Sequence, residues 1–390
     1  MTAEQRRLRL APFYIAQGIA MASLAAVITL LGDIRDEFGL SETQLGLVVG
    51  AGFFAAFVAQ LTLGRLADKG YAPAMIRYGL VGTAICMIGF AFGSTFWEFM
   101  FWRALLGFAV GVAQPAIRRT VILAEPKHTG RNIGRLGVAE VLGFGLGPAV
   151  AGVLAEVGSF DLPFYVIAVV IIVTLLGIGH LDSDEGAQSI DDRSALLLLR
   201  DRRLVGTLII VTSQFLLIGS YEAVWAVMAT DLGAETWEIG LSFTVFGIPL
   251  ALFATLGGSW AQRSGNIAIA AVGLGAAAVL AMPIAFINSV WGVVGMAFVA
   301  AIGAGIGFPA GLYFYSQTVV DERQAAAQGV LGATEVLFGG VAAVLAAWLY
   351  DAQDQIAVWL IMPMITIICI LAGVILREGT RHSPHVGATT

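Results

Sequence analysis

The two halves of this chain carry the same faint sequence repeat, and that repeat restricts the possible folds more than any other feature. Residues 64–69 read Gly-Arg-Leu-Ala-Asp-Lys, and about 195 residues later 258–263 read Gly-Ser-Trp-Ala-Gln-Arg. Four further pairs keep this offset in the same order: Gly46 with Gly240, Trp97 with Trp291, Pro115 with Pro309, and Glu140 with Glu335. Five ordered matches exceed what chance gives in a Gly/Ala-rich chain, so we predict two related halves.

The composition places those halves in a membrane. Hydrophobic residues make up 58% of the chain and charged residues 12%, whereas soluble domains have about 25% charged residues. Apolar segments long enough to cross a bilayer, about 20 residues each, fall into two sets of six. The first set is 11–32, 44–64, 74–94, 97–117, 134–156 and 162–181, and the second is 204–228, 238–260, 266–287, 291–316, 328–350 and 356–376. We therefore predict an all-α membrane protein with twelve transmembrane helices in two pseudo-symmetric halves, an architecture typical of secondary transporters.

The distribution of basic residues predicts the orientation of these helices. Arginines and lysines gather in segments that all fall on one side of a twelve-helix path, and the opposite loops carry only Arg35. By the positive-inside rule, both termini are therefore cytoplasmic. The outer loops are short and acidic, which leaves no room for an external domain and fits a bacterial inner (plasma) membrane protein.

The domain boundaries follow from the same segments. We expect an N-terminal six-helix half at 1–181, a cytoplasmic linker at 182–203, a C-terminal six-helix half at 204–377 and a cytoplasmic tail at 378–390. The linker begins acidic and becomes apolar and basic from residue 195. Its second part is therefore either a plain tether or a short helix at the membrane surface.

The turn after the second apolar segment resembles the signature of a known family. Gly64, Leu66, Ala67, Asp68 and Lys69 match the start of the cytoplasmic loop motif Gly-x-Leu-Ala-Asp-Arg-x-Gly-Arg of the major facilitator superfamily. The rest of that motif is degenerate here, and the copy in the second half has glutamine in place of the aspartate. The resemblance extends over residues 10–377 and implies the twelve-helix facilitator fold.

That resemblance also implies a conformational gate at this turn. The gate residues would be Gly64, Asp68, Lys69, Arg77 and Arg263, with Arg77 supplying the charge that the degenerate motif lacks. An aspartate at such a turn can cap backbone N–H groups and pair with nearby arginine in one state of the transporter. The alternative is a tight turn with a solvated charge.

Two motifs inside the apolar segments extend the resemblance. Arg103, followed by glycines at 107 and 111, is similar to the family's helix 4 motif Arg-x-x-Gln-Gly, although leucine replaces the glutamine. An arginine within an apolar helix is costly, so it either faces a cavity or extends to the outer surface. In the fifth segment, Gly143, Gly147, Pro148 and Gly152 resemble the antiporter motif of drug-exporting facilitators. This motif implies export, and generic glycine packing is the alternative.

Four acidic side chains lie in or near the apolar segments. Carboxylates inside a membrane are typical of proton relays, so Glu222 is our first candidate for proton coupling, with Arg103, Glu140 and Glu335 as further candidates. Glu222 lies either in a cavity or close enough to the outer surface to be solvated. The repeat partners Glu140 and Glu335 either carry protons or pair with arginine at an inner gate. Glu98 is expected at the interface with water.

In facilitators the first, fourth, seventh and tenth helices line a central cavity, and the resemblance implies the same here. Candidates for the cavity wall share an aromatic or amide side chain on those helices: Tyr14, Gln17, Gln214, Tyr221, Trp225, Phe308 and Tyr313. A mainly apolar and aromatic wall with a few polar groups suits a lipophilic compound, cationic ones included, better than a sugar.

We therefore predict a secondary active transporter that exports lipophilic or amphipathic small molecules in exchange for protons, as one half rocks against the other. A metabolite uptake symporter or uniporter of the same fold is the alternative. The two cysteines and four histidines show no metal-ligand spacing, and no phosphate-binding loop is present, so we predict no enzyme, metal site or cofactor. The expected partners are substrate, protons and membrane lipid, without nucleic acid, for a chain that works as a monomer.

Overall fold

The computed structural model describes residues 3–124, 129–178, 199–319 and 324–378, and every regular element in these ranges is a helix. The first half contains α1 (Ala3–Thr29), α2 (Leu31–Phe38), α3 (Glu42–Leu63), η1 (Gly64–Leu66), η2 (Ala67–Tyr71), α4 (Ala72–Ala91), α5 (Phe96–Ala124), α6 (Thr129–Val157) and α7 (Leu162–Ile178). The second half contains α9 (Arg202–Thr212), α10 (Gln214–Asp231), α11 (Thr236–Ser264), α12 (Ala268–Ala281), η4 (Met282–Phe286), α13 (Val290–Gln317), α14 (Gln324–Gln353) and α15 (Gln355–Glu378).

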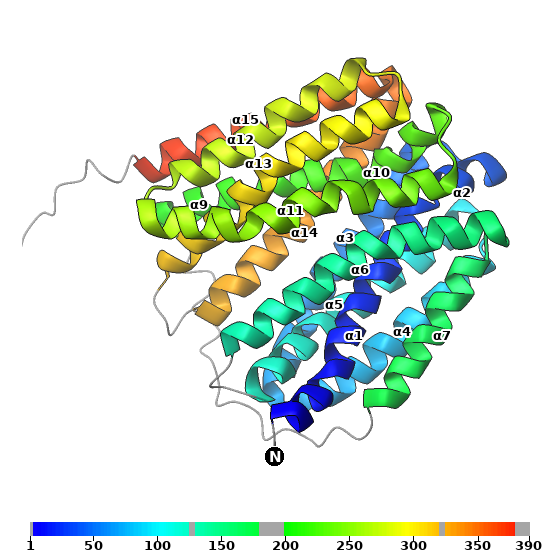
Figure 1. Ribbon diagram of the computed structural model, residues 1–390, viewed down its shortest axis with the longest axis horizontal. Coiled ribbons are helices and arrows are strands. Elements are labelled where there is room, and N and C mark those ends of the chain that lie inside the picture. The colour runs from blue at the N-terminus through cyan, green and yellow to red at the C-terminus, as the bar shows by residue number, and fades with distance from the viewer. Residues whose placement is uncertain (1–2, 125–128, 179–198, 320–323, 379–390) are drawn as a thin grey trace, which may run out of the picture.

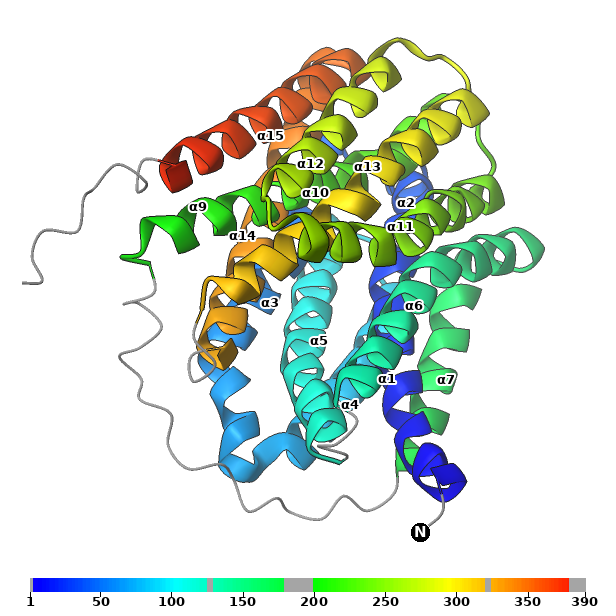
Figure 2. The same cartoon turned by 60° about the vertical axis from the view of Figure 1, so that its left-hand side comes forward.

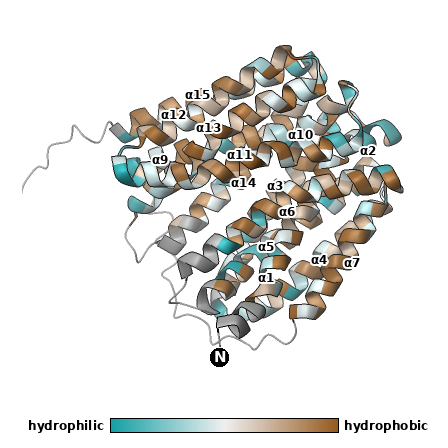
Figure 3. Cartoon of the chain, in the orientation of Figure 1, coloured by the Kyte–Doolittle hydropathy of each residue, from teal (hydrophilic) through white to brown (hydrophobic). Residues whose placement is uncertain are grey.

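These helices form two bundles, one from each half, which lie against each other (Figures 1 and 2). Eleven described segments are long and apolar enough to cross a membrane, and Leu162–Ile178 is a shorter apolar helix. Hydrophobic residues run along the helices, while hydrophilic ones gather near α2 and the start of α9 (Figure 3). The prediction of an all-helical protein with twelve membrane segments is thereby confirmed. We call the end that carries α2 the outer end and the end that carries η2 the inner end, after the orientation predicted from the charges.

The halves meet where small residues let helix backbones approach closely. α3 packs against α14, and α6 packs against α11. A Cβ atom added at Gly46 of α3 would overlap Ala347, and one added at Gly240 of α11 would overlap the carbonyl of Pro148. Gly46 and Gly240 are partners in the sequence repeat, so the repeat places a glycine at the same kind of contact in each half.

The seventh predicted segment, 204–228, is not a single straight helix. α9 ends at Thr212 and α10 begins at Gln214, with Ser213 between them. The hydroxyls of Thr212 and Ser213 donate to backbone carbonyls of the preceding turn at 2.8 and 2.7 Å. Such bonds compete with the helical ladder and bend helices, which explains a break that hydropathy could not predict.

A short helix at the outer end was also absent from the prediction. The first span was expected to reach residue 32, but α1 ends at Thr29 and α2 follows as a separate helix that packs against α10 of the other half. α2 ends at Gly39, whose φ of 65° lies in the left-handed region that favours glycine. This helix places Asp33 and Arg35 at the contact between the halves.

Candidate functional site

A cavity of about 620 Å³ lies between the two halves. Its wall comes mainly from α1, α3, α5 and α6 of the first half and from α10, α11, α13 and α14 of the second. Six phenylalanines contribute to the wall: Phe53, Phe144, Phe215, Phe243, Phe246 and Phe308. The wall also holds five ionisable charged side chains: Arg103, Arg118, Glu140, Glu222 and Glu335. An apolar, aromatic cavity with a few charged groups is typical of a small-molecule site.

The deepest charged groups of this cavity are Arg103 and Glu222. Their side chains are 3% and 10% exposed, and Nη2 of Arg103 lies 3.7 Å from Oε2 of Glu222. Nη1 of Arg103 also donates to the backbone carbonyl of Leu24 at 3.2 Å. Arg103 lies on α5 and Glu222 on α10, so this ion pair joins the two halves. Arg103 therefore faces the cavity rather than the outer surface, and Glu222 is buried rather than solvated.

Glu140 lies nearer the inner end and belongs to a polar cluster within the first half. Its Oε1 accepts from Nε2 of Gln17 at 3.0 Å and from Nη2 of Arg118 at 3.2 Å. This arrangement is the arginine pairing that was one of the two alternatives for Glu140. Its repeat partner Glu335 lines the same cavity, but no ion pair joins it to any part of the chain that the structure describes.

The structure brings only some of the predicted wall residues to the cavity. Gln214, Tyr221 and Phe308 line it, whereas four others do not: Tyr14, Gln17, Trp225 and Tyr313. Trp225 is fully buried, and its Nε1 donates to Ser242 at 2.7 Å.

Those four placements correct the prediction, and packing explains them. On α10 the wall ends at Glu222, so Trp225 lies beyond the cavity, where the halves are packed together. Gln17 is fully buried behind Glu140, and Tyr14 and Tyr313 pack against hydrophobic clusters. Helical spacing predicts which residues share a face, but it does not predict where along that face a cavity ends.

Three polar wall residues were missed by the prediction: Gln60 on α3, and Gln114 and Arg118 on α5. Gln114 and Arg118 lie on the same face as Arg103, in a row of lining residues at 103, 107, 111, 114 and 118, with Val110 beside it. Steps of three and four residues are the ordinary helical signal for a shared face. Extending that spacing from Arg103 would have found Gln114 and Arg118.

The turn predicted as a gate is a sharp, glycine-dependent turn. Gly64 ends α3 with a φ of −52°, and Gly70 lies inside η2 with a φ of 92°, which favours glycine. In the second half Gly265 ends α11 with a φ of 60°. Lys69 and Arg263 are exposed, Arg77 lies in α4, and the side chain of Asp68 is outside the described residues. The gate role therefore stays a prediction.

The glycine run that resembles the antiporter motif lies on α6 and contacts two helices. Cβ atoms added at Gly143 and Gly147 would overlap α1, and one added at Gly152 would lie 2.5 Å from a backbone oxygen of α11. The carbonyl of Pro148 lies against Gly240 of α11. The run thus packs α6 tightly against its own half and against the other half.

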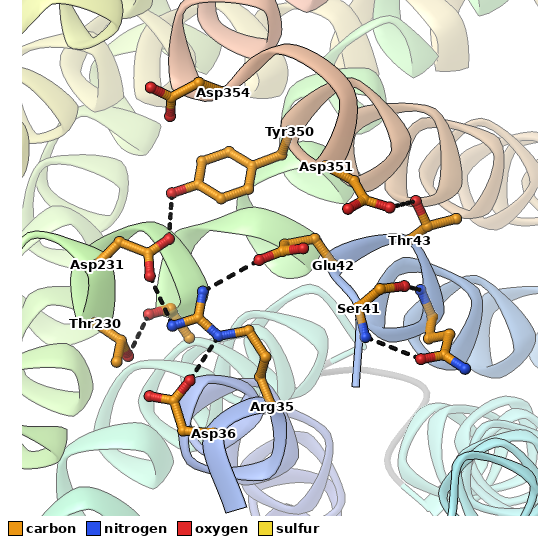
Figure 4. Close-up of polar contacts among 12 residues, drawn as sticks. Arg35, Asp36, Ser41, Glu42, Thr43, Thr230, Asp231, Tyr350, Asp351 and Asp354 are labelled. Atoms are coloured by element: carbon orange, nitrogen blue, oxygen red, sulfur yellow. Dashed lines mark hydrogen bonds and ion pairs between the residues drawn. The ribbon is translucent and has the colours of Figure 1, made fainter. Parts of the chain in front are cut away.

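Polar contacts close the outer end between the halves (Figure 4). Arg35 of α2 forms an ion pair with Asp231 of α10, with Nη2 and Oδ1 2.6 Å apart, and Tyr350 donates to the same carboxylate at 2.7 Å. Arg35 also pairs with Asp36 at 2.7 Å and Glu42 at 3.3 Å. Burial by itself lowers the pKa of Arg35, but the bonds to Asp231 and Asp36 outweigh this and raise it, so the guanidinium stays charged.

Two more contacts cross between the halves at this end. Thr236 donates to Asp33 at 3.0 Å, and Thr43 donates to Asp351 at 2.5 Å. We call these residues, together with Arg35, Asp231 and Tyr350, the outer cluster. Burial, and then the nearby charges of Asp36, Glu156 and Glu37, raise the pKa of Asp33 against the opposing bond from Thr236. The cavity is thus closed at the outer end and extends to the half-exposed side chain of Arg118 at the inner end.

Known proteins resemble this chain along most of its length. The sequence pattern of the Major Facilitator Superfamily matches residues 13–221 and 204–389. The quinolone resistance protein NorA of Staphylococcus aureus (strain MSSA476) is 25% identical over 358 residues, covering 89% of this chain and 90% of that protein. The multidrug resistance protein MdtG of Proteus mirabilis (strain HI4320) is 24% identical over 285 residues, covering 69% of this chain and 71% of that protein.

Solved structures show the same fold at low sequence identity. A bacterial homolog of the human lysosomal transporter Spinster, in an inward-facing and unoccupied conformation, matches with a TM-score of 0.81 at 13% identity and covers 97% of both chains. A point mutant of the nucleoside transporter NupG matches with a TM-score of 0.78 at 16% identity, covering 95% of this chain and 99% of that one. The chain therefore belongs to the Major Facilitator Superfamily and is a membrane transporter rather than an enzyme.

Proposed function

We propose that this chain exports lipophilic or amphipathic small molecules in exchange for protons, across a bacterial inner membrane with both termini in the cytoplasm. The observation that carries the proposal is the ion pair of Arg103 and Glu222, which joins the two halves in the wall of an apolar cavity. Ionisable residues within a membrane are typical of proton pathways and coupling sites. In this proposal the chain works as a monomer whose partners are substrate, protons and lipid.

The ion pair links protonation to the contact between the halves. A proton bound at Glu222 removes the negative charge that attracts Arg103, so the attraction between α5 and α10 weakens. A ligand shifts a conformational equilibrium only through contacts that differ between the two states, and this contact changes with the proton. In the exchange, Glu222 takes up a proton from the outer side while the outer end is open, and the halves rock back to the closed outer end of this structure. Loss of the proton to the inner side then restores the attraction between Glu222 and Arg103. The substrate leaves by the opposite rocking movement, which opens the outer cluster and closes the inner end.

The proposed substrate class rests on the cavity wall. The wall is mainly apolar, with six phenylalanines, and this favours compounds with a large apolar surface over sugars. Two relatives, NorA and MdtG, are described as quinolone and multidrug resistance proteins, which supports export of such compounds by this chain as well. The glycine run of α6, which resembles an antiporter motif, supports the same direction of transport.

The test uses purified protein in liposomes that enclose a pH-sensitive dye. A pH step is imposed, and lipophilic cations, sugars and organic acids are added in turn while the lumenal pH is followed. We expect lipophilic compounds to drive proton movement opposite to their own. The Glu222→Gln variant should bind substrate and remain folded but lose proton exchange, because its side chain cannot take up or release a proton.

A matched control is Glu98→Gln, which changes an exposed carboxylate at the start of α5. This variant should exchange protons like the original protein. Full exchange by Glu222→Gln would remove Glu222 from the mechanism. Proton movement in the same direction as the substrate would indicate the uptake symporter, and substrate flux without proton movement would indicate the uniporter.

A further inference from the structure

The charged residues of the cavity do not balance. Two arginines and three glutamates line the described wall. Arg103 pairs with Glu222 at 3.7 Å, and Arg118 pairs with Glu140 at 3.2 Å. With all five side chains charged, one carboxylate remains in excess, and that carboxylate is Glu335. Arg118 lies within electrostatic reach of Glu335, but it is already bonded to Glu140.

A second polar group of the same wall has an unused acceptor. Gln214 is 8% exposed, and its Oε1 has no hydrogen-bond partner among the described residues. Its side chain lines the cavity. An acceptor without a partner at a buried position is costly unless something donates to it. A donor on a molecule inside the cavity would satisfy it.

These two acceptors lie at the same level of the bundle. α10 and α14 pack against each other where Gly219 approaches Gly339. Gln214 precedes Gly219 by about one and a half turns, and Glu335 precedes Gly339 by about one turn. α10 and α14 both run towards the outer cluster, where Asp231 and Tyr350 lie near their ends, so both acceptors lie on the inner side of this contact, and both face the cavity.

An aromatic pair completes the surroundings. Phe215 follows Gln214 in the sequence and lines the same cavity, and its ring lies 5.9 Å, centroid to centroid, from that of Phe308, which also lines the cavity. Aromatic rings attract cations through their faces and also bury the apolar part of a ligand. A carboxylate, an amide oxygen and two rings are complementary to a protonated amine on a hydrophobic molecule.

We propose that Glu335, Gln214 and the Phe215–Phe308 pair form a subsite for the protonated amine of a lipophilic substrate. This inference rests on the proposed function, because it takes the cavity as the substrate site. The Arg103–Glu222 pair then couples transport to protons, while Glu335 selects the charge of the substrate. The two tasks belong to different carboxylates.

Three fluorescent probes of similar shape test the subsite on the purified full-length protein in detergent. Pyrenemethylamine is a cation with N–H donors, its N-trimethyl derivative is a cation without them, and pyrenemethanol is neutral. Glu335→Gln should weaken the binding of both cations by about tenfold or more and leave pyrenemethanol unchanged. Gln214→Leu should weaken only the amine that has N–H donors.

A substitution of Arg118 should change the affinity for the cationic probes in the opposite direction. Arg118→Gln leaves Glu140 without its cation, so the cavity gains a second unpaired carboxylate. Both cationic probes should then bind more tightly than to the original protein, and pyrenemethanol should bind as before. Unchanged cation binding in both Glu335→Gln and Arg118→Gln would overturn the proposal.

Chemical labelling gives a readout on the unaltered protein, in case Glu335→Gln fails to fold. A hydrophobic carbodiimide modifies carboxyl groups in apolar sites, and the modified residue is located by mass spectrometry of peptides. Modification of Glu335 should be slowed by pyrenemethylamine and not by pyrenemethanol. Equal modification with and without the amine would overturn the proposal.

Binding is measured here without any pH gradient, so the two proposals fail in different ways. A protein that binds the cations through Glu335 but moves no protons would keep the amine subsite and lose the proton-coupled export. A protein that exchanges protons but binds all three probes equally well after Glu335→Gln would keep the export and lose the subsite.

Discussion

At the scale of single residues, the buried pair of Arg103 and Glu222 carries a large desolvation cost. Taking two charges out of water is unfavourable, and their attraction compensates only while both are present. Removing one partner leaves the other charge without compensation in an apolar wall. A pair with this cost is expected where the protein needs a charge that can change.

Single and double variants of the pair measure how far each charge depends on the other for its stability. Arg103→Met should lower the free energy of unfolding by a few kcal/mol, somewhat less than the about 3–5 kcal/mol of fully enclosed pairs, because the pair borders a cavity. The double variant Arg103→Met/Glu222→Gln should recover most of that loss, because no unpaired charge remains. Thermal unfolding in detergent of the original protein, the two single variants and the double variant checks this. Additive effects would show that the two side chains do not interact.

At the scale of elements, the glycines of α6 set how closely the helices approach. Gly143 lies against the backbone of Gly18 on α1, with no room for a side chain. Not every glycine of this helix is used in that way, since a Cβ atom added at Gly137 meets nothing within 4 Å. The position on the helix face therefore matters more than the glycine content.

The two positions make a matched pair of variants. Gly143→Ala should displace α6 from α1 and lower the melting temperature in detergent, because the added methyl group overlaps backbone that cannot move aside. Gly137→Ala should leave stability unchanged or raise it by up to about 1 kcal/mol, because alanine favours the helix. Equal melting temperatures for the two variants would contradict the close packing.

At the scale of the whole molecule, the outer cluster holds the two halves together at one end while the cavity extends to the other. Ion pairs and hydrogen bonds made only in this state stabilise it against the state in which the outer end is open. Asp33 is part of this cluster, and its pKa is raised mainly by burial. The closed outer end therefore binds a proton at Asp33 more readily than an open end, where water would surround the carboxyl.

Closure of the outer end should become less favourable as the pH rises. Below about pH 4, the ordinary pKa of aspartate, Asp33 is protonated in both the closed and the open state, so it does not affect closure. As the pH rises through the raised pKa of the closed state, closure increasingly opposes the ionisation of Asp33 and becomes less favourable. Spin labels on cysteines introduced at the exposed Ser159 and Ser289 should report longer distances at the outer end as the pH rises. Asp33→Asn should keep the short distance at every pH. Asp161→Asn, a change in the same half, should leave the pH response intact, and a response that persists in Asp33→Asn would exclude Asp33 as its origin.

Several features of the site followed from local patterns. Arg103, Glu222 and Gln214 stood out because polar groups in apolar helices are rare, and each of them lines the cavity. Trp225 and Gln17 stood out for similar reasons and are buried in the packed interior instead. The sequence pattern is the same for a residue that lines the cavity and for one buried between packed helices, because the pattern shows which helix face a residue lies on and not what that face contacts.

Hydropathy, the repeat and short motifs in the sequence were enough to predict the twelve apolar segments, their division into two halves and the family resemblance, because each of these signals is carried within one segment or by one fixed offset. Only the tertiary structure decided which charges meet: Arg103 with Glu222, Arg35 with Asp231, and Glu335 with none of the described residues. The members of each pair lie on different helices more than a hundred residues apart. Their meeting depends on how the halves pack, and no periodicity along the chain encodes that packing.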